Sequence, residues 1–386
     1  MIEKIVTAAQ LPGYFRFKMA LKNPEKTQRE RLAQILRAVG NTQSSRKFRI
    51  DSDMNYKQFS QNIPLTDYMY WEKQILSQKL SGANLICYDV KRYQPTSGSS
   101  SAHKWIPYSQ EFMSELDSAT QAWLGDVGRQ NPNAFRGAQY WSLSWLPQDQ
   151  RADRPSNDDL ELLPAWKRWF LQKVMAVPSA VTYTDTMQES QFATLAYLAA
   201  RPDLSLVSVW SPTFWLTLLE QLEQWRPLLA ETLNSGIWTL PGFSSPLKAP
   251  LNPRAAVILQ TFSGVDLFNQ LWPNLALISC WDSAGSQTWA QKIREFHPRV
   301  RVQGKGLWTT EGVVTVPFQH QYPAATTSHF FEWIDLDSGK ISPTWELRKG
   351  QMVQPVLTGG HGLLRYKIND ALEVTGQLGL TPTFTF

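Results

Sequence analysis

The sequence predicts a mixed α/β fold, and three observations support that prediction. Between residues 204 and 303, apolar strand-like runs alternate with helical segments that carry one apolar face. Alternation of this kind produces βαβ units, whose strands form an at least partly parallel sheet. After residue 307 the pattern changes to short strands separated by turns. Hydrophobic residues make up 42% of the chain and charged residues 18%, which is typical of a globular protein.

Two helices are expected in the N-terminal part of the chain. Apolar residues share one face over residues 25–39, and Gly40 stands where a left-handed cap would end that helix. Thr66 and Asp67 carry side chains that can cap a second helix, which continues through Leu76. These segments predict a helical start to the fold.

A strand, a polar loop and a helix are expected next. The apolar run at residues 83–88 predicts a strand. It leads into a polar loop at residues 93–101, and apolar residues on one face predict a helix from Ser109.

The alternating region and the β-rich end supply the remaining elements. Ser211 is an N-cap candidate and Pro212 suits the first helical position. The expected elements of the alternating region are a strand at 204–210, a helix from 211, a strand at 275–280, a helix at 287–296 and a strand at 299–303. The short strands expected after it lie at 313–316, 329–334, 362–367 and 372–375.

Composition excludes several classes of protein. The formal charge of +5 suits an anionic substrate but is too small and too evenly spread to favour nucleic acid. Cys87 and Cys280 lie in apolar strand-like contexts, so we expect buried thiols and no disulfide framework. No apolar run is long enough to span a bilayer, and no Cys/His cluster has metal-ligand spacing. A cytoplasmic protein without membrane or nucleic-acid partners is expected.

The loop from Thr96 to Lys104 is the first candidate site. Hydroxyl side chains, a glycine and backbone N–H groups together offer many hydrogen-bond donors, and such nests suit a polyphosphate. The residues in question are Thr96, Ser97, Gly98, Ser99, Ser100, Ser101 and Lys104. By composition alone a Ser-rich loop is more often simply a loop, and this one does not have the P-loop pattern.

Two acidic residues are the other candidates. Glu311 follows Thr309 and Thr310, and a carboxylate beside a triphosphate normally acts through Mg²⁺ because two anions repel each other. Asp370 stands beyond an expected strand, where a carboxylate can accept both hydroxyls of a ribose. Taken alone, the pentapeptide at 308–312 favours a capping or solvated role for Glu311.

The three motifs resemble those of the acyl-adenylate-forming superfamily. They are the run from Thr96 to Lys104, the segment Trp308-Thr309-Thr310-Glu311-Gly312, and the segment from Tyr366 to Asp370. The last of these has Lys367 and Asn369 where the superfamily usually has Arg and Gly. The resemblance implies that the loop clamps phosphates, that Thr309 and Thr310 approach adenine and the α-phosphate, and that Asp370 binds ribose. It also implies catalytic roles for Glu311 and Lys104, with Glu311 holding the metal.

More narrowly, the chain resembles the Gretchen Hagen family, the auxin-responsive acyl-acid amido synthetases, and its bacterial relatives. The supporting segments are Ile63-Pro64-Leu65-Thr66-Asp67-Tyr68, Lys104-Trp105-Ile106-Pro107-Tyr108, Gln303-Gly304-Lys305-Gly306-Leu307, and Leu364-Arg365-Tyr366 through Val374-Thr375-Gly376. The resemblance implies an ATP- and Mg²⁺-dependent ligase. It would convert an acyl acid to its adenylate and then form an amide with an amino acid or another amine.

The resemblance also carries an expectation about domains. Residues 1–380 are expected to form the large N-terminal domain of the adenylate-forming fold, with strand–helix layers over about 1–306 and a barrel-like β-sheet over about 307–376. Residues 377–386 are expected to begin a hinge. Family members continue into a small C-terminal lid, which this chain is expected to lack. A partner chain could supply the lid, and turnover would be impaired without it.

Two other functions stay open at this point. A non-catalytic module that binds ATP or an acyl group would carry the same motifs without turnover, and pyrophosphate release would separate the two. A serine hydrolase built from Ser99 or Ser100 with His361 is a minor alternative, because glycines surround that histidine but no Gly-x-Ser-x-Gly elbow is present.

Overall fold

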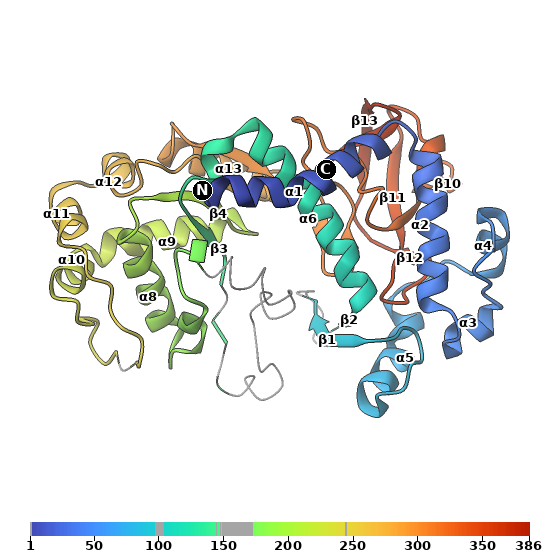
Figure 1. Ribbon diagram of the computed structural model, residues 1–386, viewed down its shortest axis with the longest axis horizontal. Helices are drawn as coiled ribbons and strands as arrows, with labels where there is room; N and C mark the ends of the chain where they lie inside the picture. The colour runs from blue at the N-terminus through green and yellow to red at the C-terminus, as the bar shows by residue number, and fades with distance from the viewer. Residues whose placement is uncertain (1, 97–103, 144, 147, 149–172, 244) are drawn as a thin grey trace. The chain divides into compact units, whose positions relative to one another are not determined.

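The chain forms two compact units. The computed structural model describes all residues except 1, 97–103, 144, 147, 149–172 and 244 (Figure 1). Unit 1 consists of Met1–Val6 and Val127–Lys305, and unit 2 consists of Thr7–Asp126 and Gly306–Phe386.

A parallel sheet forms the centre of unit 1, as the alternating pattern predicts. Its strand order is β3-β4-β5-β6, and each neighbouring pair is parallel. The strands are β3 (Ala138–Trp141), β4 (Leu204–Ser208), β5 (Leu277–Cys280) and β6 (Arg301–Gly304). Every residue of β4 and β5 is buried, which is usual for strands that are covered on both faces.

Helical segments precede and connect the strands of unit 1, and those predicted from residue 211 and at 287–296 are confirmed. The helical segments are η1 (Pro132–Phe135), η4 (Ser179–Tyr183), α8 (Met187–Ala199), α9 (Pro212–Gln224), α10 (Arg226–Ser235), α11 (Pro253–Thr261), α12 (Gly264–Leu271), η5 (Ala284–Ser286) and α13 (Gln287–Phe296). The side chain of Ser211 accepts the backbone N–H of Thr213, and Pro212 opens α9, so both start signals are confirmed.

Aromatic side chains fill the core of unit 1. Trp215 is fully buried, and its indole N–H donates to Nε2 of the buried His297 at 3.1 Å. Trp272 and Phe268 stack against each other with ring centroids 6.0 Å apart. Burial lowers the pKa of His297 to about 4, so this histidine is a neutral member of the core.

Helices make up most of the first half of unit 2. They are α2 (Pro24–Val39), α3 (Gln43–Phe48), α4 (Tyr56–Asn62) and α5 (Tyr68–Ser81), together with most of α1 (Ile2–Ala20) and of α6 (Gln110–Gln130), each of which has one end in unit 1. The predicted helices at 25–39 and after Asp67 are confirmed, and the Asp67 side chain caps α5. The prediction of a left-handed cap at Gly40 is wrong, because the φ of Gly40 is −57°, whereas a left-handed residue has a positive φ.

The strand predicted at residues 83–88 is also wrong. The backbone N–H groups of Leu85 and Ile86 donate to Oε1 of Gln78, at 2.9 and 2.8 Å, and Nε2 of the same side chain donates to the carbonyl of Cys87. A buried glutamine on α5 therefore satisfies backbone groups that a neighbouring strand would otherwise satisfy. The apolar pattern reflects burial of this loop and not strand formation.

The strands beside the Ser-rich loop form a hairpin. β1 (Val90–Pro95) pairs antiparallel with β2 (Trp105–Ser109), and α6 begins directly after β2 at Gln110. The loop therefore joins two strands, where the sequence predicted a connection from a strand to a helix.

An antiparallel sheet forms the second half of unit 2. Its order is β10-β9-β11-β13-β14, and β12 also pairs with β11. The strands are β9 (Phe330–Asp335), β10 (Ile341–Pro343), β11 (Met352–Thr358), β12 (Tyr366–Lys367), β13 (Leu372–Leu378) and β14 (Thr381–Thr385), with η6 (Thr344–Glu346) between β10 and β11. A separate antiparallel pair is β7 (Trp308–Thr309) with β8 (Gly312–Val313).

Helix α2 is fixed to this sheet by one buried side chain. Gln28 donates to the carbonyls of Thr326 and His329 and accepts the N–H of Phe331 on β9. Figure 1 shows α2 alongside the strands of unit 2. The residues expected to begin a hinge, 377–386, include the end of β13, the turn and all of β14 in the β13–β14 hairpin. The assignment of one large domain over 1–380 stays a prediction.

The two cysteines behave as the sequence predicts, since both are free and buried. Burial raises the pKa of each thiol to about 12. Within the described part of the chain, no helix combines the length and the apolar character that a membrane crossing requires.

Candidate active site

The phosphate-loop candidate begins and ends on the β1–β2 hairpin of unit 2. Pro95 pairs with Trp105, and the N–H of Thr96 donates to the carbonyl of Lys104 at 2.8 Å. The hydrogen bond closes the base of the loop. The predicted donors at its apex, Ser97, Gly98, Ser99, Ser100 and Ser101, lie outside the described residues.

Lys104 lies beside the first residue of α5. Its Nζ is 5.8 Å from the centroid of the Tyr68 ring, and the N–H of the next residue, Trp105, donates to the Tyr68 hydroxyl at 2.9 Å. Burial raises the pKa of Tyr68. The neutral phenol of Tyr68 therefore links the end of the loop to the start of α5.

Glu311 lies in the tight turn that joins β7 to β8. The hydroxyl of Thr309 donates to the carbonyl of Gly312 at 3.2 Å across this turn. The hydroxyl of Tyr108, on β2, donates to the carbonyl of Thr310 at 3.1 Å. The second motif is thus tied directly to a strand of the phosphate-loop hairpin.

Tyr366 connects the second motif to the third. Its hydroxyl lies 3.4 Å from Oε1 of Glu311. Burial raises the pKa of Tyr366, and Glu311, Asp67 and Tyr68 raise it further, so the phenol keeps its proton and donates to the carboxylate. Because Tyr68 also contacts Lys104, the structure places both predicted catalytic residues beside a pair of buried tyrosines.

A short segment before α5 fixes β12 in place. Thr66 forms a parallel bridge with Tyr366, and its carbonyl accepts the N–H of Lys367 at 2.9 Å. The hydroxyl of Thr66 donates to the carbonyl of Leu364 at 2.7 Å and accepts the indole N–H of Trp71 at 2.8 Å. Two segments far apart in the sequence therefore form one framework.

A buried ion pair supports the residue before Tyr366. Arg365 binds Glu332 through two N–H groups, with Nε–Oε2 and Nη2–Oε1 distances of 2.7 and 2.9 Å. Its Nη1 donates to the carbonyls of Ser60 and Ile63. Bidentate geometry of this kind orients the arginine strongly.

Asp370, the predicted ribose-binding residue, lies between β12 and β13. Its carboxyl group is partly buried, and burial raises its pKa. The next residue toward β12, Asn369, accepts a hydrogen bond of 3.3 Å from Gln354 on β11. Asp370 thus belongs to the same part of unit 2 as Tyr366.

The donor set suits a metal that arrives with a nucleotide. Among the described residues, no group of three or more His, Cys, Asp or Glu side chains could hold a metal ion. Mg²⁺ is commonly bound by one or two carboxylates together with substrate phosphates and water. The carboxylate of Glu311 fits that pattern.

The serine hydrolase alternative gains no support from His361. This side chain is fully buried, and both of its ring nitrogens are hydrogen-bonded, to the N–H of Leu363 and to the carbonyl of Glu311. Burial lowers its pKa to about 4. A general base needs a ring nitrogen that can reach its nucleophile, and the candidate nucleophiles Ser99 and Ser100 lie outside the described residues.

Sequence reasoning missed several residues that organise this site. Tyr68, Tyr108 and Tyr366 fall inside segments that carry the family resemblance, so the motifs could have pointed to them. Glu115 and His329 lie in contact although they are far apart in the chain, at a distance of 2.7 Å. No local sequence pattern could have joined them.

Comparison with known proteins agrees with the motifs. Residues 14–302 match the model of the GH3 family N-terminal domain, and residues 322–386 match that of the GH3 family central domain. An indole-3-acetic acid-amido synthetase, GH3.10 of Arabidopsis thaliana, is 26% identical over 200 residues. The match covers 42% of this chain and 34% of that relative, so it spans about a third of the relative's length.

Two solved structures have a similar fold. The GH3.15 acyl acid amido synthetase superposes with a TM-score of 0.77 at 17% identity, covering 95% of this chain and 68% of that one. The AtGH3.15 acyl acid amido synthetase in complex with 2,4-DB gives a TM-score of 0.80 at 18% identity, covering 96% and 69%. The mixed α/β fold of this family is thereby confirmed. Because the two family models together match most of the sequence, the chain belongs to the GH3 family.

Proposed function

We propose that this chain binds ATP through the motifs of unit 2 and converts a carboxylic acid to its acyl adenylate, which then reacts with an amino acid or another amine to form an amide. The observation that carries the proposal is the arrangement of Lys104, Glu311 and Tyr366 beside the base of the loop at 96–104. A cation, a carboxylate and a donor-rich loop are the groups that binding a metal–triphosphate requires.

The chemistry follows from the weakness of a carboxylate as an electrophile. A carboxylate oxygen attacks the α-phosphorus of ATP, a new P–O bond forms, and pyrophosphate leaves with the electrons of the broken bond. An amine nitrogen then attacks the acyl carbon, AMP leaves, and the amine loses a proton. The protein contributes mainly by positioning the reactants and neutralising charge.

The roles of individual residues are part of the proposal. Lys104 and the hydroxyl groups of the loop would bind the phosphates, and Thr309 and Thr310 would approach adenine and the α-phosphate. Asp370 would accept the ribose hydroxyls. Glu311 would hold Mg²⁺, which would offset the negative charge on the phosphates. Tyr366 would orient the Glu311 carboxylate by donating to it at 3.4 Å.

Partners and location complete the proposal. The acyl acid and the amine acceptor are small molecules, and the relatives' names, which specify amido synthetases, support that class. A lid supplied by a further domain or by a partner chain would close the site during amide formation. The proposed location is the cytoplasm, where ATP is available.

Calorimetric titration with Mg·ATP tests the nucleotide site. Asp370→Ala is expected to weaken ATP binding about ten-fold, because a charge-assisted hydrogen bond is worth about 1.5–3 kcal/mol. Glu373→Ala is the matched control, since this carboxylate is exposed on β13 of the same unit. Equal affinities for the two variants would reject the assignment of Asp370.

Pyrophosphate release then separates an enzyme from a binding module. The chain is incubated with Mg·ATP and a panel of aromatic and aliphatic carboxylic acids, with and without an amino acid. Acid-dependent pyrophosphate release supports adenylation. ATP binding without release under any of these conditions would favour the non-catalytic alternative.

A further inference from the structure

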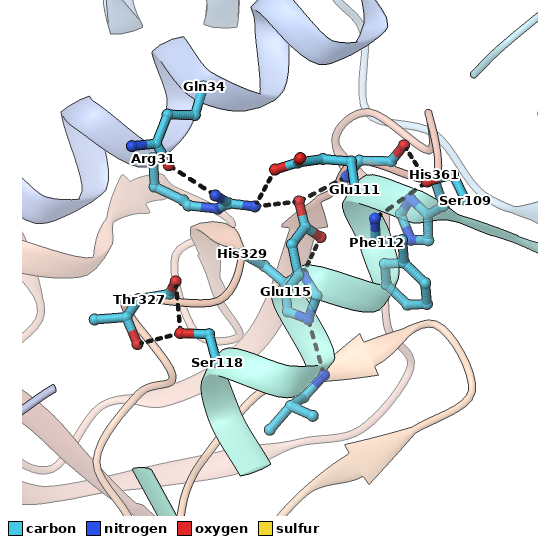
Figure 2. A network of polar contacts seen from close by, with 12 residues as sticks. Arg31, Gln34, Ser109, Glu111, Phe112, Glu115, Ser118, Thr327, His329 and His361 are labelled. Atoms are coloured by element: carbon cyan, nitrogen blue, oxygen red, sulfur yellow. Dashed lines mark hydrogen bonds and ion pairs between the residues drawn. The ribbon is translucent and has the colours of Figure 1, made fainter. Parts of the chain in front are cut away.

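A buried polar network contacts the backbone of the Glu311 turn in unit 2. Its central residue is Glu115, which is fully buried on α6 (Figure 2). Arg31 reaches it from α2, His329 from the residue preceding β9, and the glycine-rich segment 359–362 from the connection between β11 and β12. Four separate segments thus meet at one carboxylate.

Glu115 is held at both of its oxygens. Oε2 contacts Nδ1 of His329 at 2.7 Å, and Oε1 accepts the N–H of Gly360 at 2.8 Å and Nη2 of Arg31 at 2.6 Å. Burial alone would raise the pKa of Glu115, but His329 and Arg31 together keep it below the ordinary value. The Glu115 carboxylate is therefore charged, and both of its oxygens are hydrogen-bonded. We call this carboxylate the anchor.

The partners of His329 determine which of its nitrogens carries the proton. The backbone N–H of Val313 donates to Nε2 at 3.2 Å, so Nε2 has no hydrogen. Nδ1 carries the hydrogen and donates it to Glu115. One nitrogen of this ring thus binds the anchor, and the other accepts a backbone amide two residues after Glu311.

His361 has the opposite tautomer. The N–H of Leu363 donates to its Nδ1 at 3.2 Å, and Nε2 lies 3.0 Å from the carbonyl oxygen of Glu311, which can only accept. Nε2 therefore carries the hydrogen. Phe112, one turn before Glu115 on α6, stacks on the His361 ring with centroids 4.3 Å apart and on the His329 ring with centroids 5.5 Å apart.

The two histidines therefore hold opposite ends of the same short turn. His361 binds the carbonyl of Glu311, and His329 binds the N–H of Val313. The residue between them, Gly312, cannot carry a side chain, because a Cβ there would collide with Leu357 and with the ring of His329. The turn is fixed at the backbone on both sides of the Glu311 carboxylate.

We propose that His361 and His329 are positioning residues, which hold the backbone of residues 311–313 so that the Glu311 carboxylate is directed for metal–nucleotide binding. The inference rests on the proposed function, because it uses the role of Glu311 toward Mg²⁺. It goes beyond that function by assigning tautomers and distinct backbone contacts to two fully buried histidines.

Paired amide substitutions separate each histidine's contact to the turn from its other contact, which is to Leu363 for His361 and to Glu115 for His329. Glutamine places its amide near the Nε2 position of histidine, and asparagine places its amide near the Nδ1 position. His361→Gln and His329→Gln therefore keep the contacts to Glu311 and Val313. His361→Asn and His329→Asn keep the contacts to Leu363 and Glu115 and lose those to the turn.

The measurement is the ratio of ATP affinity in Mg²⁺ to ATP affinity in EDTA, obtained by calorimetry on the full chain. Each asparagine variant is expected to lower this ratio about five- to ten-fold, whereas each glutamine variant stays within about two-fold of the parent. Hydrogen exchange supplies a second readout that needs no nucleotide. The amides of residues 309–315 should exchange faster in the asparagine variants than in the glutamine variants.

Glu311→Gln distinguishes failure of this inference from failure of the proposed function. If Glu311→Gln abolishes the effect of Mg²⁺ and the asparagine and glutamine variants behave alike, the positioning role is wrong. If Glu311→Gln leaves the Mg²⁺ effect unchanged, the metal role of Glu311 is wrong, and hydrogen exchange alone then decides whether the histidines hold the turn. Equal exchange in all four variants would overturn the proposal in either case.

Discussion

Unit 1 and unit 2 use buried side chains in different ways. A buried core cluster of aliphatic and aromatic side chains surrounds the parallel sheet of unit 1. Its buried histidine, His297, packs among tryptophans and accepts one indole N–H. In unit 2, by contrast, the carboxylates of Glu115 and Glu332 are fully buried, and each binds an arginine.

The difference shows how each unit defines its structure. Apolar packing contributes free energy that depends on area and shape and not on particular backbone atoms. The buried ions of unit 2 bind particular backbone groups, such as the N–H of Gly360 and the carbonyls of Ser60 and Ile63. A buried ion pair is weak evidence of net stability, so we infer that these ions mainly position the loops that carry the motifs.

The largest expected effect comes from removing the anchor of unit 2. Glu115→Ala leaves Arg31 without its buried partner and removes the acceptor of the Gly360 N–H. We expect a loss of about 3 kcal/mol in the free energy of unfolding, the lower end of the cost of breaking a buried pair, because Arg31 keeps its contact to the partly exposed Glu111. ATP affinity should fall as well, because the Glu311 turn loses its support. Urea unfolding and calorimetry on the folded variant measure the two effects.

Leu222→Ala in unit 1 is the control that sharpens the comparison. Leu222 is fully buried on α9, and truncation of such a leucine costs about 2–5 kcal/mol. The variant should be destabilised to a similar extent while its folded form binds ATP with unchanged affinity. If both variants lost ATP affinity in proportion to their lost stability, the distinction between the two units would be wrong.

A smaller effect is expected from Arg365→Lys. Lysine keeps the positive charge but cannot form the paired contacts to Glu332 together with those to Ser60 and Ile63. We expect a cost of about 1.5–3 kcal/mol, the value of hydrogen bonds that involve charged groups. Arg201→Lys in unit 1 is the control, since its pair with Asp203 is partly exposed and should contribute about 0–1 kcal/mol. Equal costs in urea unfolding would contradict this ranking.

These results also mark what the sequence could predict. Helix α9 follows from Ser211-Pro212, and strands β4 and β5 follow from apolar runs, because caps and burial leave local signals. The strand expected at 83–88 was wrong because Gln78, on another element, bonds to that backbone. For the candidate site, the motifs indicated Glu311 and Lys104 directly. The supporting contacts of Glu115 with His329 and of Arg365 with Glu332 depend on tertiary structure and leave no periodic pattern.

Both units should lose stability as the pH falls. Burial lowers the pKa of His297 in unit 1 and of His361 in unit 2 to about 4, from an ordinary value of 6.5. At pH values between about 4 and 6.5, these two histidines bind protons in the unfolded chain but not in the folded chain. The stability that both residues provide above pH 6.5 is therefore lost as the pH falls toward 4, with a slope of up to about 1.4 kcal/mol per pH unit for each histidine.

His297→Gln and His361→Gln test this slope in each unit separately. Each substitution removes one titrating group and keeps an amide near Nε2. Urea unfolding at a series of pH values from 7.5 to 4.5 should show a shallower decline in both variants. A decline identical to that of the parent chain would show that the histidine in question is not kept neutral by folding.

The smallest expected effect concerns a device that the two units share. α8 in unit 1 and α4 in unit 2 each begin with a capping box, formed by Thr186 with Glu189 and by Asn55 with Gln58. Substitution of such a cap by alanine costs about 0.5–2 kcal/mol. Because a capping box satisfies only the first N–H groups of its own helix, Thr186→Ala and Asn55→Ala should cost similar amounts in urea unfolding and leave ATP affinity unchanged. A loss of ATP affinity in Asn55→Ala alone would mean that α4, whose Ser60 carbonyl binds Arg365, transmits local changes to the site. The positioning role would then extend from buried ions to the helices that they contact.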